Sequence, residues 1–377
     1  MQKATKTVIT IALLAAFGGA AWFSLRKGEE QAALAPPAVV RPAQTIELTG
    51  LIALDVEPYF KDPRVLKALA DKGFKVNVTR IGSREMAARA VPGQLSDFFF
   101  PSGVVAANQI ADTARKANIA TGVYSPFYSP MVIASWTPIA QLLAANGMAR
   151  ETQPKVWSVD MAKLVQVMLA RKRWKDLTGA AAYDVSKSVL VSTTDVRRSN
   201  SAAMYLALTS HAINGGDIVS DRAAAQKVGK QAAELFKRQG YQENYVNGNF
   251  DDYVSIGIGK TPMAFIYEYQ MVSYALAKKG VAADMVLLYP QPTIFNKVVF
   301  VAANEKAKGL GEALSNDPTL QKLAVDFGFR IGDAAYFAQA AKGAGLAVEE
   351  RITQIVDPPS YDVMAEMIDI VTAEMAR

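Results

Sequence analysis

The sequence predicts a two-lobed α/β protein, with mixed sheets flanked by helices, preceded by one N-terminal transmembrane helix. Strand-like runs alternate with helix-like runs along most of the chain, and several strand-to-helix junctions carry serine, threonine or glycine. An apolar run from Thr7 to Leu25 follows Lys3 and Lys6 and is long enough to cross a bilayer. With 377 residues, of which 51% are hydrophobic, the chain can bury the core of two lobes.

The composition excludes several classes of function. The chain has no cysteine, so disulfides, thiolate metal sites, a cysteine nucleophile and a lipidated cysteine are excluded. His211 is the sole histidine, which rules out a histidine-rich metal site. The net charge of +6 is spread without a long basic run, so no nucleic-acid partner is expected. No nucleophile–base pair or metal-ligand spacing is visible, and we therefore predict a protein that is not an enzyme and needs no cofactor.

The N-terminus predicts a membrane attachment. Residues 1–27 are interpreted as an uncleaved anchor, although the small residues Gly19–Ala21 leave a cleavable signal as the alternative. Residues 28–44 form a linker rich in alanine and proline. A single span followed by a large domain suggests a bacterial inner-membrane protein with its globular part in the periplasm.

Two junctions in the first half of the chain predict ligand contacts. The alternating strand Phe74–Ile81 runs into Gly82–Ser83–Arg84, and a short strand at 97–100 is followed by Pro101–Ser102–Gly103 and a helix over 104–116. In an open α/β sheet, ligands bind beyond the carboxyl ends of the strands. The alternative is ordinary turn chemistry, because serine and glycine are common at such junctions.

The stretch Val189–Leu208 is the strongest of these junctions. It is interpreted as a strand, a loop containing Thr194, Arg197 and Arg198, and a helix capped by Ser199 or Asn200. A helix start carries partial positive charge and unpaired N–H groups, so the two arginines and the hydroxyls make a cradle for an anion or a carboxylate. The alternative is a polar surface loop that only caps the helix.

Further elements complete the prediction. Ser129 precedes an apolar strand, and the strand at 263–270 opens into a helix at Tyr267 and Glu268. Residues 157–170 are predicted as one amphipathic helix, and residues 361–377 as a terminal helix whose apolar positions belong to the core. The predicted division is 45–134 and 265–377 for lobe 1 and 135–264 for lobe 2.

The order of these pieces resembles the type II extracellular solute-binding proteins, the receptors of ABC importers. The resemblance rests on the following segments: Gly82–Ser83, Asp97 with Pro101–Gly103, Ser129–Ala134, Thr194–Ser201, Tyr267–Glu268, Tyr289–Pro290 and Gly328–Arg330. It implies a periplasmic-binding-protein-like fold whose two lobes are joined by crossing strands and clamp a solute between them. It also implies an ABC permease as partner and contacts carried over by position from Ser83, Ser102, Ser129, Thr194, Ser199, Asn200 and Tyr267.

We therefore expect a membrane-tethered receptor for a small, anionic solute: an oxyanion, a carboxylate or a zwitterion. The expected binding residues are Ser83, Arg84, Ser102, Gly103, Ser129, Thr194, Arg197, Ser199, Asn200, Tyr267 and Glu268. Glu268 would repel an anion, so it either pairs with an arginine or meets a cationic group of a zwitterion. Two alternatives stay open: a ferric-iron site using the tyrosines with Glu268, and an envelope sensor that uses the same fold without transport.

Overall fold

Strand β4 (Gly122–Trp136) takes part in two sheets, one in each lobe, and thereby joins them. The computed structural model describes residues 45–240, 242 and 247–377. The chain divides into two compact units, Met1–Thr45 and Ile46–Arg377. All the helices and strands described here belong to the second unit. The predicted anchor and linker, at 1–27 and 28–44, lie outside the described residues. Among the helices that are described, none is long and apolar enough to cross a membrane.

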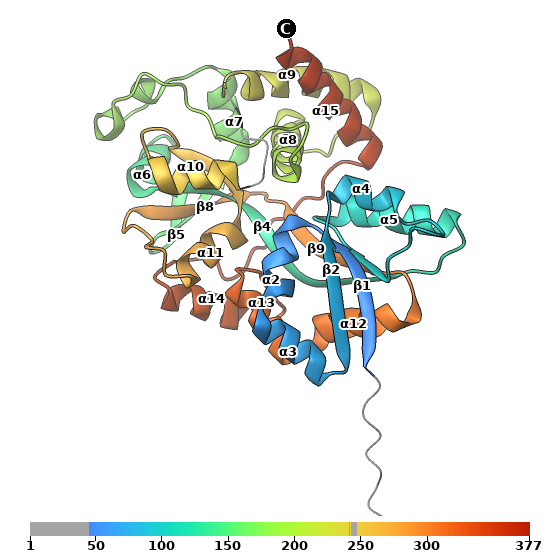
Figure 1. Ribbon diagram of the computed structural model, residues 1–377. Coiled ribbons are helices and arrows are strands. Elements are labelled where there is room, and N and C mark those ends of the chain that lie inside the picture. Colours follow the sequence, from blue (N-terminus) through green and yellow to red (C-terminus); the bar gives the residue numbers. More distant parts are fainter. Residues whose placement is uncertain (1–44, 241, 243–246) are drawn as a thin grey trace, which may run out of the picture. The chain divides into compact units, whose positions relative to one another are not determined.

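The first sheet has the strand order β2-β1-β3-β9-β4. Its strands are β1 (Ile46–Ile52), β2 (Phe74–Arg80), β3 (Phe98–Phe100), β9 (Phe295–Ala302) and the first half of β4. Strands β2, β1 and β3 are parallel, and β9 is antiparallel to both β3 and β4. The accompanying helices are α2 (Glu57–Lys61), α3 (Pro63–Asp71), α4 (Ser83–Ala88), α5 (Val104–Lys116), α12 (Glu305–Asn316) and α13 (Pro318–Asp326). Figure 1 shows β1 and β2 side by side, with α3 and α12 nearby.

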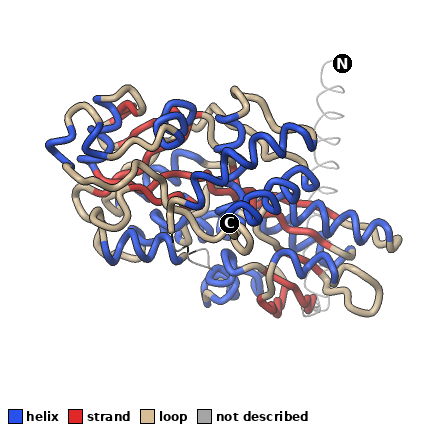
Figure 2. Tube along the Cα trace, turned by 90° about the horizontal axis from the view of Figure 1, so that it is seen from above, coloured by secondary structure: helices blue, strands red, loops and turns tan. Residues whose placement is uncertain are grey.

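The second sheet is built on the other half of β4. Its strands are β7 (Met263–Tyr267), β8 (Met285–Gln291), β6 (Val156–Asp160) and β5 (Ala149–Gln153). Its helices are α6 (Thr137–Ala145), α7 (Met161–Leu169), α8 (Asn200–Ile213), α9 (Arg222–Lys237) and α10 (Gly248–Ile256). Two further helices, α11 (Glu268–Leu276) and α14 (Ala334–Gly343), contact each other, and the terminal helix α15 (Tyr361–Met375) packs against α9 and α8. Seen from above in Figure 2, the strands run through the middle with helices on both sides.

The polypeptide passes between the two lobes more often than the sequence suggested. Strand β8 belongs to the second sheet and β9 to the first, so the chain crosses between them at 292–294. Helix α15 then returns to the helices of the second sheet. The predicted boundaries at 134/135 and 264/265 stay a prediction, because Ile46–Arg377 forms one unit. Strands β7 and β8 belong to the second sheet and therefore to lobe 2, and α15 belongs to the same lobe because it packs against α9 and α8.

Two predicted elements differ from the structure. The helix predicted over 157–170 begins only at Met161, because Val156–Asp160 forms the buried strand β6 beside β8. Asp160 is the signal for this boundary, since its side chain accepts a hydrogen bond from the Lys163 amide at 3.0 Å. The strand expected from Val189 forms only isolated bridges. There the Thr193 amide donates to the Gln239 side chain instead of to a neighbouring strand.

Gly328 allows the chain to lie directly against α11. Its φ is +83°, and a Cβ at this position would come within 2.2 Å of the Tyr269 carbonyl oxygen. A side chain is therefore excluded both by the left-handed backbone and by rigid backbone contact. The close approach brings the following residues, Phe329 and Arg330, under the end of β7.

We expect Gly328→Ala to destabilise the protein far more than the matched substitution Gly345→Ala. Gly345 has nearly the same φ, +82°, but nothing within 4 Å of an added Cβ. Gly345→Ala should therefore cost only the left-handed penalty of about 1–2 kcal/mol, and Gly328→Ala clearly more. Urea denaturation of both variants measures the difference, and equal losses would show that the contact with Tyr269 is unimportant.

Candidate functional site

A cavity of about 1000 Å³ lies between the two lobes and gathers residues from distant parts of the chain. Five of the predicted residues line it: Ser83, Ser102, Ser199, Asn200 and Tyr267. They come from the start of α4, the segment before α5, the start of α8 and the end of β7. The junctions singled out in the sequence therefore meet at one place.

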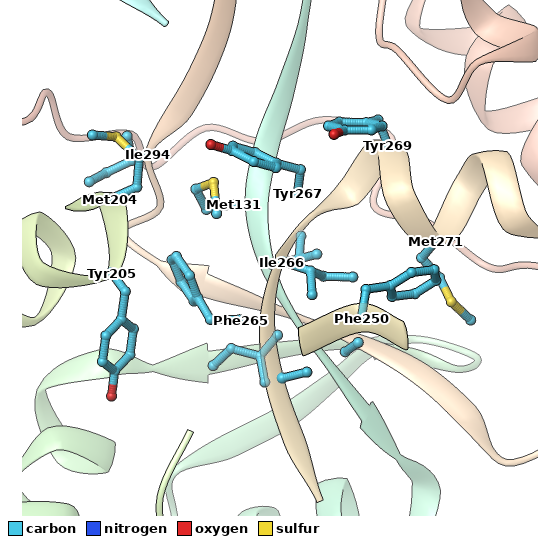
Figure 3. Packing of buried hydrophobic residues seen from close by; sticks show 14 of the residues in the cluster. Met131, Met204, Tyr205, Phe250, Phe265, Ile266, Tyr267, Tyr269, Met271 and Ile294 are labelled. Carbon is cyan, nitrogen blue, oxygen red and sulfur yellow. The ribbon is translucent and has the colours of Figure 1, made fainter. Parts of the chain in front are cut away.

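The floor of the cavity contains two sets of hydrogen bonds, one on the side of each lobe. The Ser102 amide donates to Ser83 Oγ at 2.9 Å, and Ser102 Oγ donates to Asp55 Oδ2 at 2.6 Å. On the other side, Asn200 Nδ2 donates to the Tyr267 hydroxyl at 3.0 Å. The rings of Tyr267 and Tyr269 stack with centroids 5.5 Å apart, and Figure 3 shows both at one end of the buried cluster.

Asp55 is a cavity residue that the sequence analysis missed. It follows β1 directly, so its position at the carboxyl end of a parallel strand could have revealed it. The side chain is 9% exposed and forms no ion pair within the described residues. Burial raises the pKa of its carboxyl group, and hydrogen bonds from Ser102 and Tyr269 oppose this only in part. The cavity thus contains a buried carboxyl group that pairs with no basic side chain among the described residues.

Gly103 and Asn296 meet behind this floor. Gly103 has a φ of +89°, and a Cβ there would lie 3.0 Å from Asn296 Oδ1 and 3.5 Å from Asn200 Nδ2. Asn296 is 2% exposed, and neither its oxygen nor its nitrogen has a hydrogen-bond partner in the part of the chain that is described. A buried unpaired amide is costly, and Asn296 carries this cost directly behind the cavity floor. Sequence reasoning had no signal for this residue.

The two arginines before α8 have different surroundings. Arg198 is exposed and lines the cavity. Arg197, the predicted contact, does not line it, and its guanidinium pairs with the buried Asp195 carboxylate. That interaction lowers the pKa of Asp195 and fixes the loop, since Asp195 Oδ1 also accepts from the Arg197 amide at 2.8 Å. Of these two arginines, Arg198 is therefore the one whose charge faces the cavity, which Arg80, paired with Glu57, and the acidic side chains Asp55, Glu85 and Asp369 also line.

The start of α8 is open to the cavity. Ser199 occupies the N-cap, as predicted, but its hydroxyl hydrogen-bonds to Ser201 Oγ at 2.8 Å and caps no backbone amide. Thr194 is buried and its hydroxyl also bonds to Ser201 Oγ, at 2.9 Å, so Thr194 supports the loop from behind. The first turn of this helix of 14 residues keeps its partial positive charge toward the cavity, beside Arg198.

Three further predicted residues, Gly103, Ser129 and Glu268, do not line the cavity. Arg84, which was also predicted, lies in the first turn of α4. Gly103 borders the floor as described above. Ser129 is fully buried, where its oxygen accepts from the Tyr269 amide at 3.0 Å and so fixes the start of α11. Glu268 is fully buried in an ion pair with Arg330, which is the first of the two arrangements expected for it.

The buried ion pair of Glu268 and Arg330 connects the start of α11 to the segment that follows α13. Arg330 Nε and Nη2 donate to the two carboxylate oxygens at 2.5 and 2.8 Å, and the Tyr289 hydroxyl donates to Glu268 Oε1 at 2.6 Å. Arg330 also donates to the backbone carbonyls of Glu349 and Glu350 and lies 4.6 Å from the ring centroid of Phe337. Both carboxylate oxygens of the fully buried Glu268 accept hydrogen bonds within the protein, so this residue does not face the cavity.

Comparisons with known proteins identify the fold. No protein-family model and no curated protein matches the sequence. The structure is similar to a ferric binding protein from Campylobacter jejuni, with a TM-score of 0.54, 13% sequence identity, and coverage of 87% of this chain and 97% of that chain. It is also similar to a proposed extracellular solute-binding protein from Bordetella parapertussis, with a TM-score of 0.51, 11% identity, and coverage of 87% and 98%. The chain therefore has the two-lobed α/β fold of extracellular solute-binding proteins, and the resemblance predicted from the sequence is confirmed at the level of the fold.

We expect Asp55→Asn to stabilise the protein at neutral pH. Because burial raises the pKa of Asp55, the folded state keeps a proton that the unfolded state releases, and the stability contributed by this group falls as the pH rises through that window. Removing the charge should recover about 1.4 kcal/mol for each unit by which the pKa is raised. Urea unfolding at pH 4 and pH 7 tests this.

The gain from Asp55→Asn over wild type should be larger at pH 7 than at pH 4. Asp71→Asn serves as control, because Asp71 is an exposed carboxylate paired with Lys67 and should show no such increase. A less stable Asp55→Asn variant at pH 7 would show that the carboxylate is satisfied within the protein.

We expect breaking the buried ion pair to cost more than removing it. Glu268→Leu leaves Arg330 charged and unpaired, and should lower the free energy of unfolding by about 3–5 kcal/mol. The double variant Glu268→Leu/Arg330→Met should lose less than the sum of the single losses. Lys67→Met, in an exposed pair, should cost below about 1 kcal/mol. Additive losses in the double variant would contradict the coupling.

Proposed function

We propose that this protein is an extracytoplasmic solute-binding receptor that holds a small solute with an anionic group between its lobes and delivers it to an ABC-type importer. The observation that carries the proposal is the convergence of Ser83, Ser102, Ser199, Asn200 and Tyr267 on one cavity between the two sheets. The fold shared with solute-binding proteins supports the class of function.

The anionic group is assigned to the lobe 2 side of the cavity. Arg198 and the uncapped start of α8 supply a full positive charge and a helix dipole at the same place. Asn200 adds an amide whose position is fixed by Tyr267. Lobe 1 adds the Ser83 and Ser102 hydroxyls, so a bound solute contacts both lobes at once.

Closure of the lobes is the mechanical output. A solute that contacts both sides favours the closed state only by the extra contacts it gains there. Strand β4 and the crossing at 292–294 restrict this movement to a hinge at the base of the cleft. The proposal includes attachment to the inner membrane through the apolar run Thr7–Leu25, which lies outside the described residues.

The geometry favours an organic or inorganic anion over ferric iron. Burial, with the charge of Asp55, raises the pKa of both Tyr267 and Tyr269, so their phenolate forms are disfavoured. Asp55 is the carboxylate whose charge acts on both tyrosines, and no group of three His, Cys, Asp or Glu side chains suited to a metal ion is found among the described residues. Glu268, which the iron alternative used, is engaged by Arg330.

We expect a thermal-shift screen of the purified protein against oxyanions, carboxylates, amino acids and iron chelates to reveal an anionic ligand. A ligand that binds the native state raises the melting temperature. Arg198→Gln should weaken that ligand about 10- to 100-fold in calorimetric Kd, which corresponds to a charge-assisted hydrogen bond of about 1.5–3 kcal/mol.

The neighbouring variant Arg197→Gln is the matched control. Arg197 does not line the cavity, so its removal should lower stability through Asp195 but leave the Kd within about threefold of wild type, below 1 kcal/mol. A screen without any stabilising anion, or an Arg198→Gln variant with unchanged Kd, would refute the proposed site.

A further inference from the structure

The terminal helix α15 has two apolar faces. One face packs against α9, where Ile370 lies so close to Gly229 that a Cβ on the glycine would meet Ile370 Cγ2 at 3.1 Å. Met367 and Val371 are fully buried on this side, and Arg222 forms an ion pair with Glu366 at 3.2 Å. This face fixes helix α15 to α9 in lobe 2, and α15 also contacts α8.

The second face of α15 lines the cavity. Its residues are Tyr361, Met364, Ala365, Ile368 and Asp369, which recur at the spacing of one helical stripe. Met204 from α8 continues the apolar surface on the same side, and Val105 and Ala106 from α5 line it from lobe 1. Figure 1 shows α15 beside α9, with its N-terminal end next to α4 and α5. The cavity thus has a polar floor and a wall that is apolar at Met364, Ala365 and Ile368, to which Asp369 adds an exposed carboxylate.

We propose that the solute is an organic anion with an apolar body, and that Met204, Met364, Ala365 and Ile368 bind that body. This inference rests on the proposed function and specifies its ligand class. The anionic group meets Arg198 and the start of α8, and the hydrocarbon part extends along α15.

Size and hydration support this assignment over an inorganic anion. A cavity of about 1000 Å³ is at the upper end of the range of roughly 300–1,000 Å³ typical of small-molecule sites. A small oxyanion at the polar floor would leave the wall of α15 facing water, whereas an alkyl or aryl group removes that surface from water. Because α15 belongs to lobe 2 and α5 to lobe 1, closure brings apolar surface to both sides of such a group.

The test measures calorimetric Kd for four straight-chain carboxylates that share one anionic group: acetate, butyrate, hexanoate and octanoate. For the wild-type protein, each added methylene should lower the Kd about three- to fourfold. Ile368→Asn should flatten this dependence on chain length and leave the Kd of acetate within about threefold of wild type. The control is Ile256→Asn, because Ile256 is 56% exposed on α10 and lines no part of this cavity.

The outcomes separate this inference from the proposed function. A dependence on chain length that Ile368→Asn removes and Ile256→Asn preserves supports the apolar wall. Equal Kd values for acetate and octanoate in the wild-type protein overturn it, as does Arg198-dependent binding of an inorganic oxyanion with no carboxylate bound. If neither oxyanions nor carboxylates bind, the proposed function itself is refuted and the inference with it.

Discussion

The structure depends on one strand that is hydrogen-bonded in two sheets. Residues 122–130 of β4 pair with β9, and residues 131–136 pair with β7 and β8. Because β4 is hydrogen-bonded to β9 in one sheet and to β7 and β8 in the other, the two lobes meet along this strand. The carboxyl ends of β1, β3 and β7 consequently face one cleft, and the side chains that follow them, including Asp55, Ser102 and Tyr267, become neighbours although the chain separates them widely.

The buried polar groups divide into those that are satisfied and those that are not. Glu268, Arg330 and Tyr289 satisfy one another, and Ser129 and Thr194 are bonded within the protein. These interactions stabilise the hinge side. Asp55, by contrast, lines the cleft without an ion pair and with a raised pKa, and Asn296 lies behind the floor with no hydrogen-bond partner among the described residues. Burial of both groups costs free energy, although buried side chains away from this cavity, such as Thr193 and Trp157, also have unpaired atoms in the described part of the chain.

The sequence predicted the fold, and the convergence of its strand-to-helix junctions on one cavity, better than the partners of individual side chains. Ser83, Ser102, Asn200 and Tyr267 were found because strand-to-helix junctions carry a readable pattern, and that pattern also predicts where they converge. Arg197 was selected for its charge and Glu268 for its place at a junction, but their partners Asp195 and Arg330 decide what each one does. Asn296 is the second residue of β9, where only tertiary packing reveals that its amide is unpaired among the described residues. Likewise, β6 was hidden in a helical period because its pairing with β8 overrides local preference.

The central claim is that two lobes close on a solute at this cleft, and the distance between them tests it most directly. The chain contains no cysteine, so spin labels can be placed at Lys116→Cys on α5 and Lys227→Cys on α9 without removing native thiols. Pulsed electron–electron double resonance should give a shorter mean distance between the two spin labels, and a narrower distribution, when the solute found by the screen is added. An unchanged distribution at saturating solute would contradict closure of the lobes around the ligand.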